Sequence, residues 1–138
     1  MRPINPPPSS NKSMSKAMIV ETGRLLILSG HVPMTPEGHL IGPGIKEQTE
    51  QVFENIGAAL KEAGVGFKDL VKITIFLCPM TPETLNGFRE VRDRYINLDC
   101  PPTSSLVGVS ALVNPDFLVE IEAIAELSAS KIAELSAS

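Results

Sequence analysis

The chain has 138 residues, of which 43% are hydrophobic and 20% are charged, and its net charge is −4. This length predicts a single domain with a substantial hydrophobic core. The acidic balance argues against nucleic acid as a partner, and no apolar run approaches the roughly 20 residues that span a bilayer. The first residues, MRPINPPPSSNKS, lack the apolar core of a secretory signal, so we expect a cytoplasmic protein.

Strand and turn signals occupy the first part of the chain. Residues 1–13 are rich in Pro, Ser and Asn and are expected to form a flexible N-terminal segment. From Ala17 onward, MIVETGRLLILSGHV predicts two strands around a turn at residues 22–23, the second strand covering 25–28 and ending at Ser29-Gly30. The unbroken apolar run LLIL indicates a strand that is buried on both faces.

Two helices are predicted from periodic apolar residues and cap signals. The first covers residues 45–63, where the apolar side chains form one stripe, and Gly64 ends it. The second begins with Thr81 as the N-cap and a proline in the first turn, and it should run to about Asn97.

Further strands are predicted at residues 71–77, 106–112 and 117–126. Together with the two helices they predict an α+β fold, one sheet with two helices on one face. The other face would carry too many aliphatic side chains for water, whether these are Leu26, Leu28, Ile73 and Ile75 or their alternating neighbours. We therefore expect an obligate oligomer.

The end of the chain repeats itself, because IAELSAS occurs at residues 124–130 and again at 132–138. Two identical copies without divergence are not an evolved solenoid, so we interpret the second as a recent duplication or an artificial extension. The expected domain is 14–128, and the tail at 129–138 should lie outside it.

Three separated motifs resemble one known family. SGHVP at residues 29–33 is similar to a strand end of the Rid (YjgF) family, and VKITIFL followed by a helix with F-x-x-V-x-x-x-Y resembles its central strand and second helix. PPTSSLVGVSALVNPDFLVEIEAIA at residues 101–125 resembles the C-terminal signature of that family. The resemblance covers about residues 15–127.

This resemblance implies a chorismate-mutase-like fold and a homotrimer with three clefts between subunits. It also implies hydrolysis of reactive imines and enamines to a keto acid and ammonia, without a metal or an organic cofactor. In the family, an arginine at the start of the signature binds the substrate carboxylate, which suits its bidentate geometry. A glutamate in the last strand positions the attacking water.

Carried onto this chain, the pattern is incomplete. Glu120 matches the glutamate if one residue is inserted near Asn114, and Ser104 stands where the arginine would be. The family's asparagine in the second helix is replaced by Arg92, and its N-terminal tyrosine falls on Met14 or Lys16. The expected catalytic residue is Glu120, and the expected ligand-binding residues are Arg92, Ser104, Ser105, Gly30, Phe88 and Met14.

Several alternatives stay open at this point. Arg92 shares a helical face with Leu85, Phe88 and Tyr95, so it either pairs with a carboxylate between subunits or replaces the missing arginine as the carboxylate clamp. Glu120 shares a strand face with Glu122, which we interpret as structural. The pair is either a solvated stripe or includes the residue that activates water.

The protein is therefore either a cofactor-free imine and enamine hydrolase or a non-catalytic binder of small carboxylate metabolites. RNA cleavage, a third activity associated with the family, is disfavoured by the acidic balance. Serine catalysis would need a positioned base, and neither His31 nor His39 has the required spacing. Two cysteines, Cys78 and Cys100, cannot form a metal knuckle or a disulfide framework.

Overall fold

A computed structural model describes residues 1–8 and 12–137. The elements follow one another along the chain as β1 (Arg2–Ile4), β2 (Ala17–Ile19), β3 (Leu25–His31), α1 (Ile45–Glu62), the short 3-10 helix η1 (Phe67–Asp69), β4 (Leu70–Leu77), α2 (Pro82–Tyr95), β5 (Thr103–Gly108), β6 (Val119–Glu126) and α3 (Ala129–Ala137).

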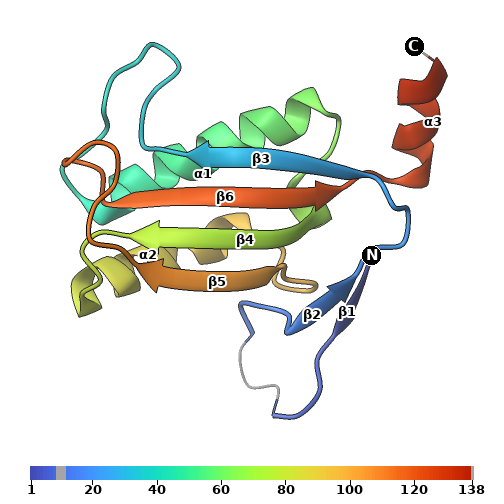
Figure 1. The fold of residues 1–138 in the computed structure, drawn as a ribbon, viewed down its shortest axis with the longest axis horizontal. Coiled ribbons are helices and arrows are strands. Elements are labelled where there is room, and N and C mark those ends of the chain that lie inside the picture. The colour runs from blue at the N-terminus through green and yellow to red at the C-terminus, as the bar shows by residue number, and fades with distance from the viewer. Residues whose placement is uncertain (9–11, 138) are drawn as a thin grey trace.

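Four strands form the main sheet in the order β3-β6-β4-β5. The pairs β3–β6 and β6–β4 are antiparallel, and β4 and β5 are parallel because α2 connects them. Both long helices lie behind this sheet in Figure 1, and β1 and β2 form a separate two-stranded ribbon at one end. The predicted α+β fold with two helices on one face is confirmed.

The core lies between the helices and the sheet. On β4, Ile73, Ile75 and Leu77 are completely buried beneath the helices, as the alternation of a strand requires. The apolar stripe of α1 meets them with the completely buried side chains of Val52, Phe53, Ile56 and Leu60. Gly64 then adopts a φ of 73°, the left-handed conformation that ends a helix after its last turn.

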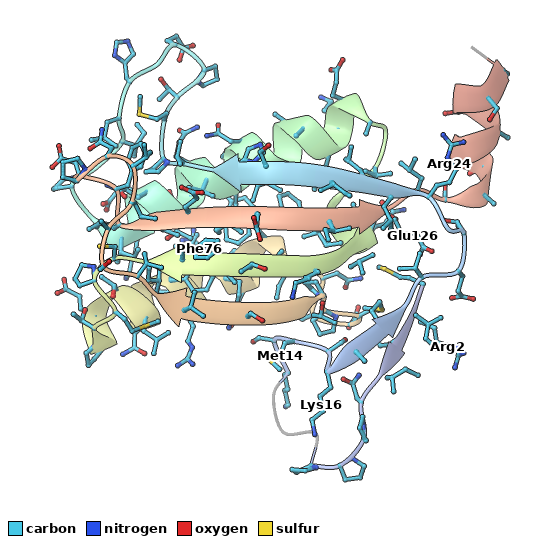
Figure 2. The ribbon with its side chains drawn as sticks, viewed as in Figure 1. Arg2, Met14, Lys16, Arg24, Phe76 and Glu126 are labelled. Atoms are coloured by element: carbon cyan, nitrogen blue, oxygen red, sulfur yellow. The ribbon has the colours of Figure 1, made fainter. Side chains whose placement is uncertain are left out.

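The face of the sheet away from the helices is bare, and we call it the open face. Strand register and alternation place on it, among others, Leu25, Ile27, Lys72, Thr74, Phe76, Ser105, Val107, Glu120, Glu122 and Ile124. Phe76 lies on this side of the sheet in Figure 2.

The bare face does not carry Leu26, Leu28, Ile73 and Ile75. It carries the residues that alternate with them along the strands. Leu28, Ile73 and Ile75 belong to the buried cluster under the helices, and Leu26 packs against it. The run LLIL is therefore not buried on both faces within one chain, because Ile27 is 72% exposed.

Two of the predicted strands have bounds that differ from the observed ones by three residues or more. The strand β3 does not end at Ser29-Gly30 but continues to His31, because an irregularity between Leu28 and His31 lets it keep its pairing with β6. The fifth strand covers 103–108 and not 106–112, because its pairing with β4 begins at Thr103 and ends at Gly108.

A buried carboxylate ties the start of the chain to the end of the sheet. Glu126 is 5% exposed and accepts hydrogen bonds from the backbone N–H of Glu21 and Thr22 at 2.6 and 2.8 Å. The Met1 ammonium lies 2.8 Å from its other oxygen. Burial opposes ionisation of Glu126, but the ammonium and the two N–H donors outweigh it and hold its pKa below the usual value.

Candidate functional site

Glu120 and Gly30 meet at the bulged end of β3. Register places Glu120 of β6 opposite Phe76 and therefore on the open face. A Cβ atom added to Gly30 would collide with the Glu120 carboxylate, so the carboxylate lies directly against the glycine backbone. Glycine is needed here for lack of space, since only a residue without a side chain admits the acid.

A hollow of about 340 Å³ opens beside Gly30 and is bordered by His31, Met34 and Asn55. The Asn55 amide fixes the loop after β3 by donating hydrogen bonds to the carbonyl oxygens of Val32 and Met34 at 3.0 and 2.8 Å. The hollow is lined by the loop after β3 and by Asn55 and Ala58 of α1, but not by Glu120, so Gly30 separates it from the acid.

His31 has a defined hydrogen-bonding state at this hollow. Its Nδ1 lies 2.7 Å from the carbonyl oxygen of Ser29, and a carbonyl oxygen can only accept, so Nδ1 carries the proton. In the neutral ring, Nε2 is then the acceptor. This contact gives His31 a structural role at the end of β3.

Gln48 positions the chain that leads into β6, and the sequence analysis missed it. Its side chain is 1% exposed, donates to the carbonyl oxygen of Asp116 at 2.9 Å and accepts from the N–H of Leu118 at 2.8 Å. The signal was present, because Gln48 lies three residues after Ile45 and four before Val52 on the buried stripe. A polar residue on an apolar stripe indicates such a bond.

Arg92 is largely buried on α2, with 9% of its surface exposed. Its Nε donates to Asp93 at 2.9 Å, and its guanidinium lies 5.6 Å from the centroid of the Phe88 ring. Because α2 covers the face opposite the open face, one chain does not bring Arg92 and Glu120 into a common cavity. Any joint action would need residues from two copies.

Phe88 belongs to the core of the chain. It is completely buried, and its ring lies 6.4 Å from that of Phe53, which in turn stacks on Tyr95 at 5.0 Å. In a single copy its ring therefore packs against the guanidinium of Arg92, and its role is structural.

Ser104 and Ser105 point to opposite sides of β5. Ser104 is paired with Ile73 and faces the helices, whereas Ser105 is paired with Thr74 and faces the open side. The segment with Met14 and Lys16 approaches the start of β5, because Ser15 donates hydrogen bonds to the carbonyl oxygens of residues 101 and 102 at 2.6 and 3.0 Å. Figure 2 shows Met14 and Lys16 at this end of the sheet. The structure thus places the Met14 segment beside residues 101–103, directly before the serine pair.

Within residues 1–8 and 12–137, no three His, Cys, Asp or Glu side chains gather as a metal-ligand set. The same part of the chain contains no helix that is long and apolar enough to cross a membrane. Both cysteines are unpaired thiols of intermediate exposure.

Two helices behind a mixed sheet, a bare opposite face and an acid at the strand end define a small α+β subunit of the YjgF type. The family model described as Endoribonuclease L-PSP matches residues 7–127. The chain belongs to this family, whose members are also called Rid, YjgF or RutC proteins.

Similar proteins come from distant organisms. A RutC family protein of Pyrococcus abyssi is 38% identical over 109 residues, which is 77% of this chain and 81% of the relative. The crystal structure of YyfB from Yersinia pestis, a protein of the Rid family, has a TM-score of 0.84 at 30% identity and covers 91% of this chain and 98% of its own. Rv2704 of Mycobacterium tuberculosis, of the YjgF/YER057c/UK114 family, has a TM-score of 0.64 at 29% identity and covers 78% and 82%.

Proposed function

We propose that this protein is a cytoplasmic homotrimer that hydrolyses small imines or enamines in clefts between subunits. The observation that carries the proposal is the Glu120 carboxylate held against the Gly30 backbone on the open face, at the end of β3. A carboxylate in such a place can bind and activate a water molecule. The fold and the family membership agree with a small-molecule ligand.

The reaction needs one base and no cofactor. Water adds to the carbon of the protonated C=N bond while Glu120 accepts one proton of the water, and a neutral carbinolamine forms. Glu120 then gives this proton to the nitrogen, and the C–N bond breaks as the hydroxyl proton of the carbinolamine passes to the carboxylate or to the departing ammonia, which leaves a keto compound. One carboxylate can serve as base and then as acid, because the proton it takes from water is the one that nitrogen requires.

The bare sheet face supports the homotrimer. Leu25, Ile27 and Val107 are 44%, 72% and 42% exposed in one copy. Leu25 and Ile27 lie on β3 and Val107 lies on β5, at the two edges of the sheet. Exposed aliphatic side chains on a sheet face mark a contact surface, and the edges of such a contact would complete a cleft around Glu120.

Arg92 remains the proposed carboxylate clamp for a neighbouring copy. Asp93 engages its Nε, so a ligand carboxylate would bind the two terminal nitrogens. On this proposal Arg92→Ala weakens binding of a small keto acid by about ten- to a hundredfold, and Arg92→Lys recovers part of the loss. If Arg92→Ala lowers stability but leaves the Kd unchanged, its role is structural.

The test of the activity is direct. Light scattering should give three times the chain mass of 14.8 kDa. Imino acids produced in solution by an amino-acid oxidase, and trapped by semicarbazide, should disappear faster with the wild-type protein. Glu120→Gln should remove this acceleration and keep ligand binding, since it preserves shape but loses the base.

A non-catalytic binder of small carboxylate metabolites is the second candidate. It is favoured by the contact of Arg92 with Asp93 and by Ser104 at the place of the family's arginine. Calorimetry with small keto acids separates the two functions. Saturable binding without acceleration of any imine would establish the binder, and acceleration that depends on Glu120 would establish the hydrolase.

A further inference from the structure

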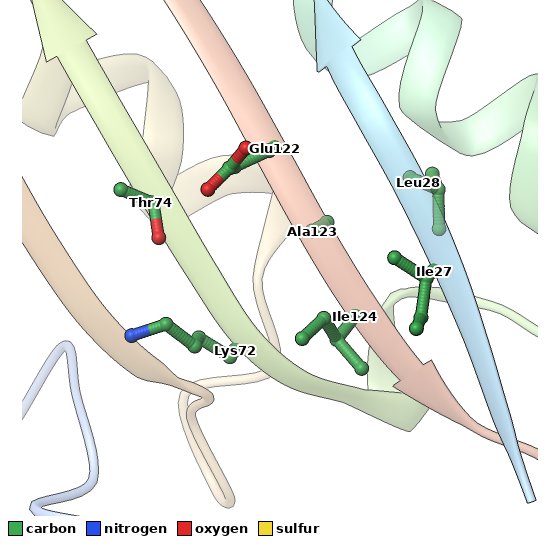
Figure 3. Close-up of a pocket in the computed structure, with 7 residues that line it drawn as sticks. All are labelled: Ile27, Leu28, Lys72, Thr74, Glu122, Ala123 and Ile124. Carbon is green, nitrogen blue, oxygen red and sulfur yellow. The ribbon is translucent and has the colours of Figure 1, made fainter.

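Two opposite charges lie among the apolar side chains of the open face. Lys72 of β4 and Glu122 of β6 border a shallow cavity of about 120 Å³ together with Ile27, Thr74 and Ile124 (Figure 3). Isolated charges are unfavourable on a surface that becomes buried, because each loses its hydration.

Neither charge has a partner of opposite sign in the described part of the chain. The ion pairs found there involve other residues. Register places Lys72 beside Thr103 and Ile124, and it places Glu122 beside Thr74. In Figure 3 the Lys72 ammonium points toward β5, away from the Glu122 carboxylate.

We infer that Lys72 of one copy pairs with Glu122 of the next when the open faces come together, so that this face selects further copies of the same chain. The inference rests on the homotrimer proposed above and specifies its contact. A cyclic assembly joins two different patches of the subunit, and it contains as many copies of Lys72 as of Glu122. Every charge can therefore be matched inside the assembly.

Such a pair acts mainly on the choice of partner. An apolar face alone would accept any aliphatic surface, whereas a buried lysine or glutamate without its counter-charge strongly disfavours the wrong partner. The apolar neighbours supply the attraction, and the two charges fix which surfaces can meet and in what register.

The experiment reverses each charge alone and then both together. Lys72→Glu and Glu122→Lys should each raise the concentration at which the trimer dissociates by about a hundredfold or more, because like charges then face each other. The double variant should return to within about tenfold of wild type, since the pair is restored with opposite polarity. Light scattering over a dilution series gives these values.

Matched controls separate a specific pair from a change of net charge. Lys61→Glu and Glu62→Lys alter exposed residues at the end of α1 by the same charge and should leave the assembly unchanged. Circular dichroism establishes that each variant is folded. Lys72→Met with Glu122→Gln removes both charges and should associate about as well as wild type.

The outcomes are distinguishable. A monomeric wild-type protein would overturn the proposed assembly itself. A trimeric wild-type protein that tolerates both single reversals, or single reversals that the double variant does not rescue, would overturn the ion pair and leave the assembly intact. Hydrolysis is tested separately with Glu120→Gln, which leaves Lys72 and Glu122 in place.

Discussion

The Glu120 carboxylate lies against the backbone of Gly30, although the two residues come from strands at opposite ends of the chain. The β3 irregularity supplies the close approach, and the missing side chain of glycine supplies the space. This contact yields the first prediction.

Gly30→Ala should lower imine hydrolysis as much as Glu120→Gln does. The added methyl group meets the flexible end of Glu120, so the acid is displaced while the fold is kept, and the free energy of unfolding should change by less than about 1 kcal/mol. Kinetics and urea unfolding measure both effects. Gly66→Ala is the control, because no atom lies within 4 Å of its added Cβ. Full activity in Gly30→Ala would show that the position of the carboxylate is unimportant.

Gln48→Leu should destabilise the protein by about 1–3 kcal/mol for each backbone group that loses its partner. The carbonyl oxygen of Asp116 and the N–H of Leu118 would be left in a buried place. Gln51→Leu is the matched control on the same helix, since Gln51 bonds only to the Asn55 side chain in the described contacts and is half-buried. Equal losses in the two variants would contradict the assigned role of Gln48.

Tyr95 gives a spectroscopic test, because it is the one tyrosine of the sequence. Burial, followed by its 2.8 Å hydrogen bond to Glu54, raises the pKa of Tyr95 to about 12. Ultraviolet titration should therefore show phenolate only near pH 12 in the folded protein and near pH 10 in urea. Glu54→Gln should lower the folded value.

The sign of the tyrosine effect on stability follows from these values. The folded protein holds the hydroxyl proton of Tyr95 more tightly than the unfolded chain does. The contribution of protonated Tyr95 to the free energy of unfolding is therefore fully present below pH 10 and is lost as the pH rises toward 12. A folded-state midpoint near 10 would mean that the Tyr95 hydroxyl is fully hydrated.

Glu126 should contribute to acid sensitivity. Its pKa is lowered in the folded state from the usual 4.5, so its stabilisation is present above pH 4.5 and is lost as the pH falls through the folded value. Glu126→Gln should cost about 1–3 kcal/mol at pH 7, because charge-assisted bonds become neutral ones. Its stability should also fall less between pH 5 and about pH 3 than that of wild type. Identical pH dependence in the two proteins would refute this role.

The helices and the fold class could be predicted because their signals are local. The stripe from Val52 to Leu60 and the Thr81 cap act within a few residues, and both predicted helices are present. The face of LLIL could not be predicted, because four successive aliphatic residues carry no alternation. Only pairing with β6 shows that Leu28 faces inward and Ile27 outward.

The candidate site depends on contacts that are distant in sequence. The motif pointed to Gly30 and Glu120 separately, but their meeting depends on a bulge and a register that no local pattern encodes. The same holds for Ser104 and Ser105, whose facing directions follow from pairing with Ile73 and Thr74. Whether these residues bind a ligand stays a prediction.

The strand order has a consequence for protein synthesis. The main sheet takes β6, one of its two inner strands, from near the end of the described chain, and β3 pairs within this sheet with β6 alone. While a ribosome is still making residues 119–126, the aliphatic β3 has no strand to join, although both long helices have already been synthesised. The nascent chain therefore carries an unpaired hydrophobic strand until β6 is available, which is the condition under which chaperones bind. Truncation before residue 119 should leave the protein permanently in that state.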